Sequence, residues 1–115
     1  MIGMFAKCKE LKLLDLSYFN TSSLTDMSFI FNGCEKLKEI KGLNNFNTKN
    51  VTKMIGMFDL CKELISLNLS NFDTSNVIDM SLLFSECYKL KEIKGLNNFN
   101  TNQEIGRAHV WTPVT

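Results

Sequence analysis

Four cysteines are the residues of this chain best suited to hold a metal or to form a covalent bond. They stand at Cys8, Cys34, Cys61 and Cys87, with spacings of 26, 27 and 26 residues. Zinc sites need closely paired ligands such as Cys-x2-Cys, which these spacings do not provide. Unpaired cysteine is among the residue types most often buried. We therefore expect four buried thiols, with disulfides as the alternative, and no metal site.

Candidate catalytic groups are scarce. His109 is the only histidine and stands near the end of the chain, so nucleophilic catalysis that uses a histidine base has no other candidate. The aspartates are too far apart to form the clustered carboxylates of a calcium loop. They include Asp15, Asp26, Asp73 and Asp79. The sequence therefore predicts that the chain is not an enzyme and binds no cofactor.

The overall charge and hydrophobicity exclude further classes of partner. Thirteen basic residues against twelve acidic ones leave a net charge of +1 in 115 residues, too weak a field to attract nucleic acid or an anionic membrane. No apolar run has the length that a bilayer span requires. A hydrophobic fraction of 44% with 22% charged residues is typical of a folded chain. We expect a folded domain with no nucleic-acid partner and no membrane insertion.

The elements that position these residues belong to an internal repeat. The stretch Cys34–Thr48 returns 53 residues later as Cys87–Thr101 with one substitution, and a looser version lies between them. Four units align on Met1, Met27, Met54 and Met80, which gives the boundaries 1–26, 27–53, 54–79 and 80–103. Self-similarity at a fixed period indicates units that stack on their neighbours. The second and fourth units share a Lys-Gly insertion at 41–42 and 94–95, so the true period is a pair of units.

Each unit contains two local patterns. Leu67-Asn-Leu69 alternates apolar and polar residues, which predicts a short strand with one buried face. Asp26–Phe31 and Asp79–Phe84 place an aspartate and a serine before a compact apolar group, which predicts a capped helical turn. Lys53 stands where the other turns have Asp26 and Asp79, which puts the cap of the turn that follows it in question. The recurring Leu, Ile and Phe positions predict a continuous apolar core between stacked units.

The columns of the repeat resemble those of a known family. The pattern Leu-x-x-Leu-x-Leu-Ser-x-Phe-(Asn/Asp)-Thr-Ser, followed by Asp-Met-Ser-x-x-Phe-x-x-Cys, is similar to that of the BspA-like leucine-rich repeat surface proteins, in particular the mycoplasma-type lipoprotein repeat. The resemblance implies an α/β repeat fold, a right-handed leucine-rich-repeat-type solenoid of four units of 26–27 residues, each with a short strand and a short helical turn. It also implies a bacterial protein at the cell surface or secreted, with adhesion or host interaction as its function.

Both ends of the chain depart from a complete array. Met1 stands in the column of the methionines that open the other units, whereas terminal units of a repeat array are ordinarily atypical caps. We therefore expect an array that is truncated at both ends. Residues 104–115, which hold the only His, Trp and Pro, resemble a translated sequencing adapter and are predicted to be a non-native tail. The alternative is a genuine C-terminal cap in which Trp111 covers the last core layer.

The expected function follows from the resemblance and from the extended surface that stacked repeats present. We expect a fragment of a cell-surface protein that binds an extracellular protein or glycan, without catalysis. The candidate contact residues are the polar strand positions Asp15, Lys38, Lys41, Ser66, Asn68 and Lys91. The alternatives are a structural spacer that displays another domain, or a remnant of a larger protein whose functional domain is missing. Units without caps expose apolar layers, so end-to-end self-association is also expected.

Overall fold

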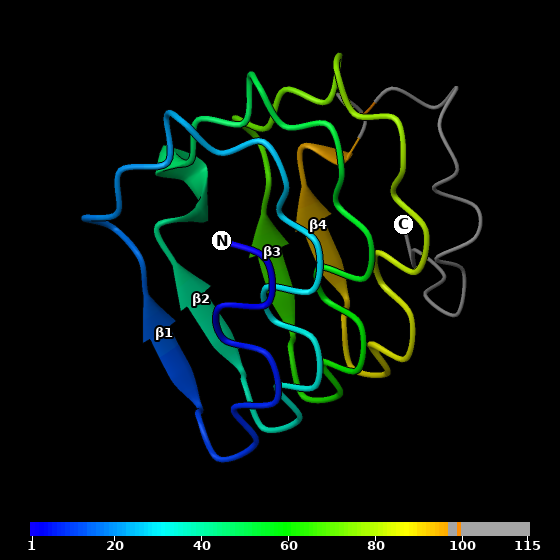
Figure 1. Cartoon of the computed structure of the whole chain (residues 1–115). Helices are drawn as coiled ribbons and strands as arrows, with labels where there is room; N and C mark the ends of the chain where they lie inside the picture. Colours follow the sequence, from blue (N-terminus) through cyan, green and yellow to red (C-terminus); the bar gives the residue numbers. More distant parts are fainter. Residues whose placement is uncertain (97–98, 100–115) are drawn as a thin grey trace.

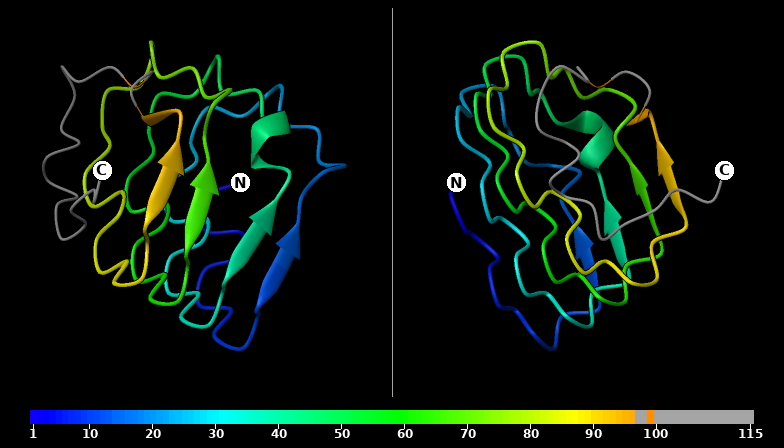
Figure 2. Two further views of the ribbon diagram at one scale, coloured as in Figure 1. Left: turned by 180° about the vertical axis from the view of Figure 1, so that it is seen from behind. Right: turned by 90° about the vertical axis from the view of Figure 1, so that its right-hand side faces the viewer.

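The computed structural model describes residues 1–96 and 99. It contains four three-residue strands and one short 3₁₀ helix, in the order β1 (Leu13–Asp15), β2 (Glu39–Lys41), η1 (Leu43–Asn45), β3 (Ser66–Asn68) and β4 (Glu92–Lys94). Figure 1 shows the four strands side by side and pointing the same way. Figure 2 shows that the strands form one side of the molecule and the remaining turns of each unit form the other.

The strands pair two by two. β1 and β2 are parallel, with Leu14 opposite Ile40, and β3 and β4 are parallel, with Leu67 opposite Ile93. Within residues 1–96 and 99, no ladder joins β2 to β3. Each pair joins an odd unit to the even unit that follows it. The sheet pairing therefore has the same two-unit period as the sequence.

The Lys-Gly insertion of each even unit lies against the odd unit of the same pair. Gly42 has a φ of 92° and Gly95 a φ of 86°, left-handed conformations that glycine adopts without steric cost. A Cβ on Gly42 would lie 2.5 Å from the backbone nitrogen of Ser17, and one on Gly95 would lie 2.4 Å from the Cα of Ser70. The missing side chain allows two backbones to approach closely.

The predicted fold class, an α/β repeat solenoid with a strand and a helical turn in every unit, is wrong. The described residues form strands, turns and coil, with two separate two-stranded parallel sheets and no α-helix. In the segment expected to be a helical turn, the amides of Phe29 and Phe31 donate hydrogen bonds of 2.8 and 3.0 Å to carbonyls of the next unit, and the amide of Met27 donates one of 2.9 Å to the carbonyl of Lys53 at the boundary with that unit. An α-helix needs these amides for carbonyls four residues earlier in its own segment. Hydrogen bonds between units thus replace the helix.

The aspartates expected to cap those turns do accept local hydrogen bonds. Asp26 and Asp79 each accept the amide two residues later at 2.9 Å, an arrangement typical of Asx turns. Lys53 forms parallel bridges with both of them. The amide of Ile55, which an aspartate at position 53 would cap, instead donates to Oγ of Ser28 at 3.1 Å. Ser28 of the second unit therefore supplies to Ile55 the acceptor that an aspartate at position 53 would have provided.

Apolar side chains at equivalent positions stack into columns, as the repeat predicts. One column of rings consists of Phe5, Phe31, Phe58 and Phe84, with successive centroids 6.0, 5.5 and 5.9 Å apart. A second consists of Phe46, Phe72 and Phe99, with centroids 6.4 Å apart. Many leucines and methionines, among them Leu37, Met57 and Leu64, are buried in the same apolar core. Three-residue strands are too short to be stable by themselves, so these columns hold the units together.

The cysteines form a further column. Cys34, Cys61 and Cys87 are buried, as predicted, and Cys8 is half-buried. The three buried thiols donate to a phenylalanine carbonyl oxygen of the preceding unit, at Sγ–O distances of 3.1, 3.2 and 3.1 Å. Burial raises the pKa of Cys34 to about 11 and that of Cys87 to about 12. These thiols stay protonated at neutral pH and link one unit to the next.

The predicted non-native tail at 104–115 lies outside the described residues. The same holds for 100–103, the end of the fourth unit. The unit boundaries and the assignment of the tail therefore stay predictions.

Candidate binding groove

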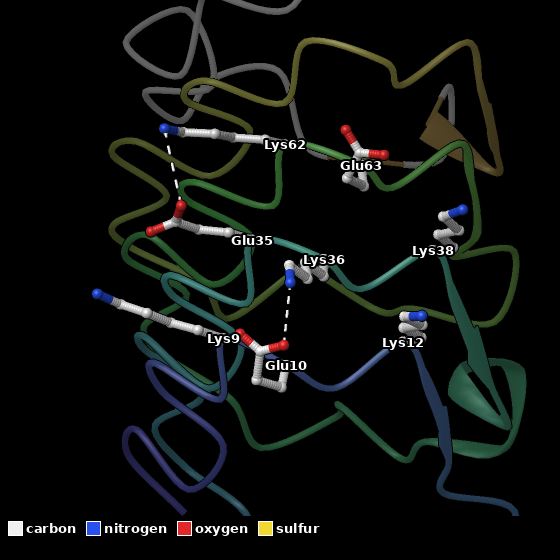
Figure 3. A pocket seen from close by; sticks show the side chains of 8 residues that line it. All are labelled: Lys9, Glu10, Lys12, Glu35, Lys36, Lys38, Lys62 and Glu63. Carbon is white, nitrogen blue, oxygen red and sulfur yellow. Dashed lines mark hydrogen bonds and ion pairs between the residues drawn. The ribbon is translucent and has the colours of Figure 1, made fainter.

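An open hollow of about 550 Å³ lies where the first three units turn after their cysteines. Figure 3 shows its lining, which consists of lysines and glutamates alone. The lining residues are Lys9, Glu10, Lys12, Glu35, Lys36, Lys38, Lys62 and Glu63. We call this hollow the charged groove.

A tight turn in each unit presents these side chains to solvent. The amide of Leu37 donates to the carbonyl of Cys34 at 3.2 Å, and the amide of Leu64 donates to that of Cys61 at 3.4 Å. The side chains of these two cysteines and two leucines are buried in the core. The two residues between each cysteine and leucine therefore lie at the surface. Core packing thus fixes the spacing of the charges from unit to unit.

Opposite charges alternate along the groove and pair between neighbouring units. Lys36 Nζ lies 2.9 Å from Glu10 Oε1, and Lys62 Nζ lies 4.0 Å from Glu35 Oε1. Beyond the groove, Nζ of Lys89 lies 2.9 Å from Oε2 of Glu63. Exposed ion pairs contribute little stability because water and salt screen them.

Three lysines of the groove take no part in these pairs. Lys9, Lys12 and Lys38 are exposed and form no ion pair with any residue among 1–96 and 99. The amide of Lys38 donates to the carbonyl of Lys12 at 2.9 Å, so the two residues are in register in successive units, and Figure 3 shows both at the same edge of the groove. The groove therefore carries positive charge that its own glutamates leave unpaired.

The positive charge also acts on a glutamate of the lining. The hydrogen bond from Lys89, followed by the fields of Lys89 and Lys38, lowers the pKa of Glu63. Glu63 therefore stays ionised at neutral pH and remains paired with Lys89.

The chemistry of the groove is that of charge recognition. Exposed ammonium groups bind carboxylate, sulfate or phosphate oxygens as point charges. In the part of the chain that the structure describes, no cluster of His, Cys, Asp or Glu is arranged to hold a metal ion. None of the helices within 1–96 and 99 has the length and apolar character to cross a membrane.

The contact residues predicted from the sequence lie in two places. Lys38 lines the charged groove, and Lys91 holds the equivalent position just before β4. Asp15 and Lys41 are exposed register partners at the ends of β1 and β2. The structure therefore pairs Asp15 with Lys41 in the register of β1 and β2, and of these three residues only Lys38 lines the groove.

The remaining predicted residues lie in β3, and some strand side chains already have local partners. Ser66 is exposed at the first position of β3, and Asn68 is half-buried at the third. Asn68 Oδ1 accepts the amide of Ser70 at 3.1 Å and its hydroxyl at 2.5 Å. Asp15 forms the same turn, and hydrogen bonds from the hydroxyl and amide of Ser17 lower its pKa. A ligand on this face would compete with these bonds, and a binding role for it stays a prediction.

The sequence prediction was confined to strand positions and contains only Lys38 of the groove. The signal for the rest was the alternation of sign after successive cysteines, from Lys9 through Glu35 to Lys62, with the opposite order one residue later. That signal becomes visible only when the units are placed beside one another.

The side-by-side units and their exposed charged groove define a repeat protein. The chain belongs to the family described as Mycoplasma protein of unknown function, DUF285, which matches residues 1–111. The matched range includes part of the segment 104–115. No curated protein and no solved structure matches the chain.

Proposed function

We propose that this chain is part of a BspA-like leucine-rich repeat surface protein that adheres to an extracellular protein or glycan through the charged groove, without catalysis. The observation that carries the proposal is the set of exposed ammonium groups of Lys9, Lys12 and Lys38, which no carboxylate of the described residues pairs. Membership in a mycoplasma family and the repeat pattern support display at the cell surface or secretion.

The column that contains Lys12 and Lys38 indicates the chemistry of the partner. Ile65 holds the equivalent position in the third unit and is 47% exposed, and Lys91 holds it in the fourth. An extended ligand that follows this column would meet two cations and then an apolar side chain. A protein segment with acidic residues beside an apolar one fits this order better than a uniformly charged glycan.

The experiment compares two double variants that remove the same charge from different faces. Lys12→Ala with Lys38→Ala removes both ammonium groups from one edge of the groove. Lys41→Ala with Lys94→Ala removes two exposed lysines from the ends of β2 and β4. The probes are an immobilised acidic peptide that contains leucine, and heparin. We expect the groove variant to bind the peptide about tenfold more weakly, equivalent to about 1.4 kcal/mol, and the strand variant to bind as the parent chain does.

The outcomes separate the proposals. Equal losses in both variants would indicate a dependence on net charge and would reject the groove. Tighter binding of heparin than of the peptide would favour a glycan partner. Binding to either probe should weaken as salt is raised, because the contacts are exposed charges.

One observation favours a second function, that of a structural spacer. Polar side chains also bind across units, as Lys36 does to Glu10 and as Asn76 Nδ2 does to the carbonyl of Lys49 at 2.8 Å. A surface devoted to holding units together needs no ligand. Failure of both probes to bind the parent chain would favour the spacer.

A further inference from the structure

We propose that the partner segment is an α-helix that lies across the start of the four strands and contacts one unit with each of its turns. This inference rests on the proposed function, since it names the conformation of the acidic segment that the edge of the charged groove would bind. The contact surface is a column of equivalent exposed positions, one from each unit, which we call the edge column. Its members are Lys12, Lys38, Ile65 and Lys91.

Backbone hydrogen bonds hold the edge column in register. The amide of Lys38 donates to the carbonyl of Lys12 at 2.9 Å, and the amide of Lys91 donates to that of Ile65 at 2.8 Å. Lys38 and Lys91 stand immediately before β2 and β4, whose parallel partners Figure 1 shows beside them. A ligand that crosses the units along this column therefore meets two cations, an apolar side chain and a third cation.

The spacing of the units selects the conformation of that ligand. Hydrogen-bonded strands lie about 4.7–4.9 Å apart, and the rings of equivalent phenylalanines in adjacent units lie 5.5 to 6.4 Å apart. The units therefore repeat at intervals of about 5–6 Å. An α-helix advances about 5.4 Å per turn, and its residues i, i+3, i+7 and i+10 form a stripe on one face. One turn of a helix thus matches one unit.

Other regular conformations match the column less well. In an extended strand the residues of one face repeat every 6.6–6.8 Å or about that distance, so such a segment gains about 1 Å on the column with each unit. A polyproline II helix takes about 9.3 Å per turn, so it would meet alternate units and pass over Ile65. Of the three, only the α-helix presents one side chain to every unit.

Comparison of the two pairs of units shows which part of this surface recurs. The odd units differ at exposed positions, with Lys12 and Leu13 in the first and Ile65 and Ser66 in the third. The even units are identical at four exposed positions, which are Lys36 and Lys89, Lys38 and Lys91, Glu39 and Glu92, and Lys41 and Lys94. The same charges therefore recur every second unit, at about 10–12 Å. Seven residues of a helix span about 10.5 Å, so acidic residues seven apart would meet Lys38 and Lys91 alike.

The charges beside the edge column define the partner further. Glu39 and Glu92 directly follow the two lysines of the even units and are exposed. A helix whose acidic stripe faces Lys38 and Lys91 would gain from basic residues along the flank that faces these glutamates. Complementary charges of this kind set register and specificity more than affinity. The inferred partner is an amphipathic helix with an acidic stripe that one apolar residue interrupts, bound as a helix in a groove.

The first test compares three peptides of one amino-acid composition by fluorescence anisotropy with the full chain. The first places Glu, Glu, Leu and Glu at i, i+3, i+7 and i+10, is also made in reversed order, and carries a lactam bridge on its opposite face because short helices are marginal in water. The second has the bridge but spreads the four residues around the helix. The third is unbridged and places them at alternate positions. We expect the first, in one of its orders, to bind about tenfold more tightly than the other two.

The second test locates the helix on the edge column. Ile65→Lys gives the third unit the residue that the other three units have at this position. Exchange of Leu for Glu in the first peptide should weaken its binding to the parent chain several-fold, and Ile65→Lys should restore it, since the two positions are in contact. Ile78→Lys is the matched control. It makes the same substitution in the same unit, at a position that is 64% exposed and outside the column, and should restore nothing.

The outcomes separate the helix from the proposed function. Equal binding of the first and second peptides would indicate a dependence on net charge, and tighter binding of the third would indicate an extended segment; either result overturns the helix. If Lys12→Ala with Lys38→Ala still weakened that binding, the groove edge would remain the site. Binding of heparin alone would identify a glycan partner. Absence of binding to all peptides and to heparin would reject the proposed function and the helix together.

Discussion

The ring of Phe29 lies against Gly56, so closely that a Cβ on Gly56 would come within 2.8 Å of Cε1 of Phe29. The two residues hold the same position in consecutive units and share a left-handed backbone, with φ of 60° and 55°. A large side chain in an even unit thus packs against a glycine at the equivalent position of the next odd unit. This alternation, the alternating ion pairs and the Lys-Gly insertion of the even units give physical reasons for a two-unit period.

The contact with Phe29 makes Gly56 the more sensitive of two comparable glycines. We expect Gly56→Ala to lower the free energy of unfolding by about 2–4 kcal/mol, from left-handed strain together with overpacking against the ring. Gly3→Ala carries the same backbone strain without the contact and should cost about 1–2 kcal/mol. Urea unfolding followed by circular dichroism measures both. Equal losses in the two variants would show that Phe29 moves aside without cost.

A prediction for Lys53 runs against the repeat pattern, which has an aspartate at the equivalent positions 26 and 79. Lys53→Asp would restore the aspartate found at positions 26 and 79 but would place three carboxylates in one bridged row. Like charges on neighbouring strands repel, and the amide that an aspartate would cap already has Oγ of Ser28 as its acceptor. We expect the substitution to destabilise the chain by about 0.5–1 kcal/mol at low salt, and less at high salt.

The matched experiment removes the acceptor itself. Ser28→Ala leaves the amide of Ile55 without its partner, and Ser28 is only 3% exposed. An unsatisfied buried donor costs about 1–3 kcal/mol. If Lys53→Asp stabilised the parent chain, the aspartate would be capping after all, and the role assigned to Ser28 would be wrong.

The sequence predicted the columns of the core and the burial of Cys34, Cys61 and Cys87, because a column of identical apolar residues must face its copies in neighbouring units. It did not predict the turn at Asp26–Phe31 correctly. An aspartate before a serine and an apolar cluster serves a helix cap and an Asx turn equally well, and the choice depends on whether the following amides bond within the segment or to the next unit. Local sequence contains no information on that partner.

The cysteine column predicts a specific alkaline sensitivity. Burial raises the pKa of Cys87 from an ordinary value of 9.0 to about 12, so the unfolded thiol ionises before the folded one. Its contribution to stability is complete below pH 9.0 and is lost as the pH rises toward 12, at about 1.4 kcal/mol per pH unit. Cys87→Ala removes this dependence along with the hydrogen bond to Phe58.

The measurement compares the free energy of unfolding of the parent chain and of Cys87→Ala at a series of pH values, in the presence of reductant. The variant should be less stable at neutral pH by about 1–2 kcal/mol and should lose stability less steeply above pH 9.0. Parallel curves would show that Cys87 is accessible enough to ionise in the folded chain.

The ring columns, rather than the ion pairs, should account for the cohesion between units. Phe58 is fully buried and stacks on both sides, with centroids 5.5 Å from Phe31 and 5.9 Å from Phe84. Phe58→Ala should therefore lower the free energy of unfolding by about 3–5 kcal/mol, since it removes buried area and leaves a cavity. Phe5 is half-buried, stacks on one side alone and meets Phe19 at 52°, so Phe5→Ala should cost about 1–2 kcal/mol.

The comparison with charge uses Glu63→Gln, which breaks an exposed ion pair and keeps the shape of the side chain. Its effect on urea unfolding should be much smaller than that of Phe58→Ala, because solvent screens the pair. Comparable effects of Glu63→Gln and Phe58→Ala would mean that the alternating charges hold the units together. The two-unit period would then reflect electrostatic cohesion between units, rather than the packing of a large side chain over a glycine.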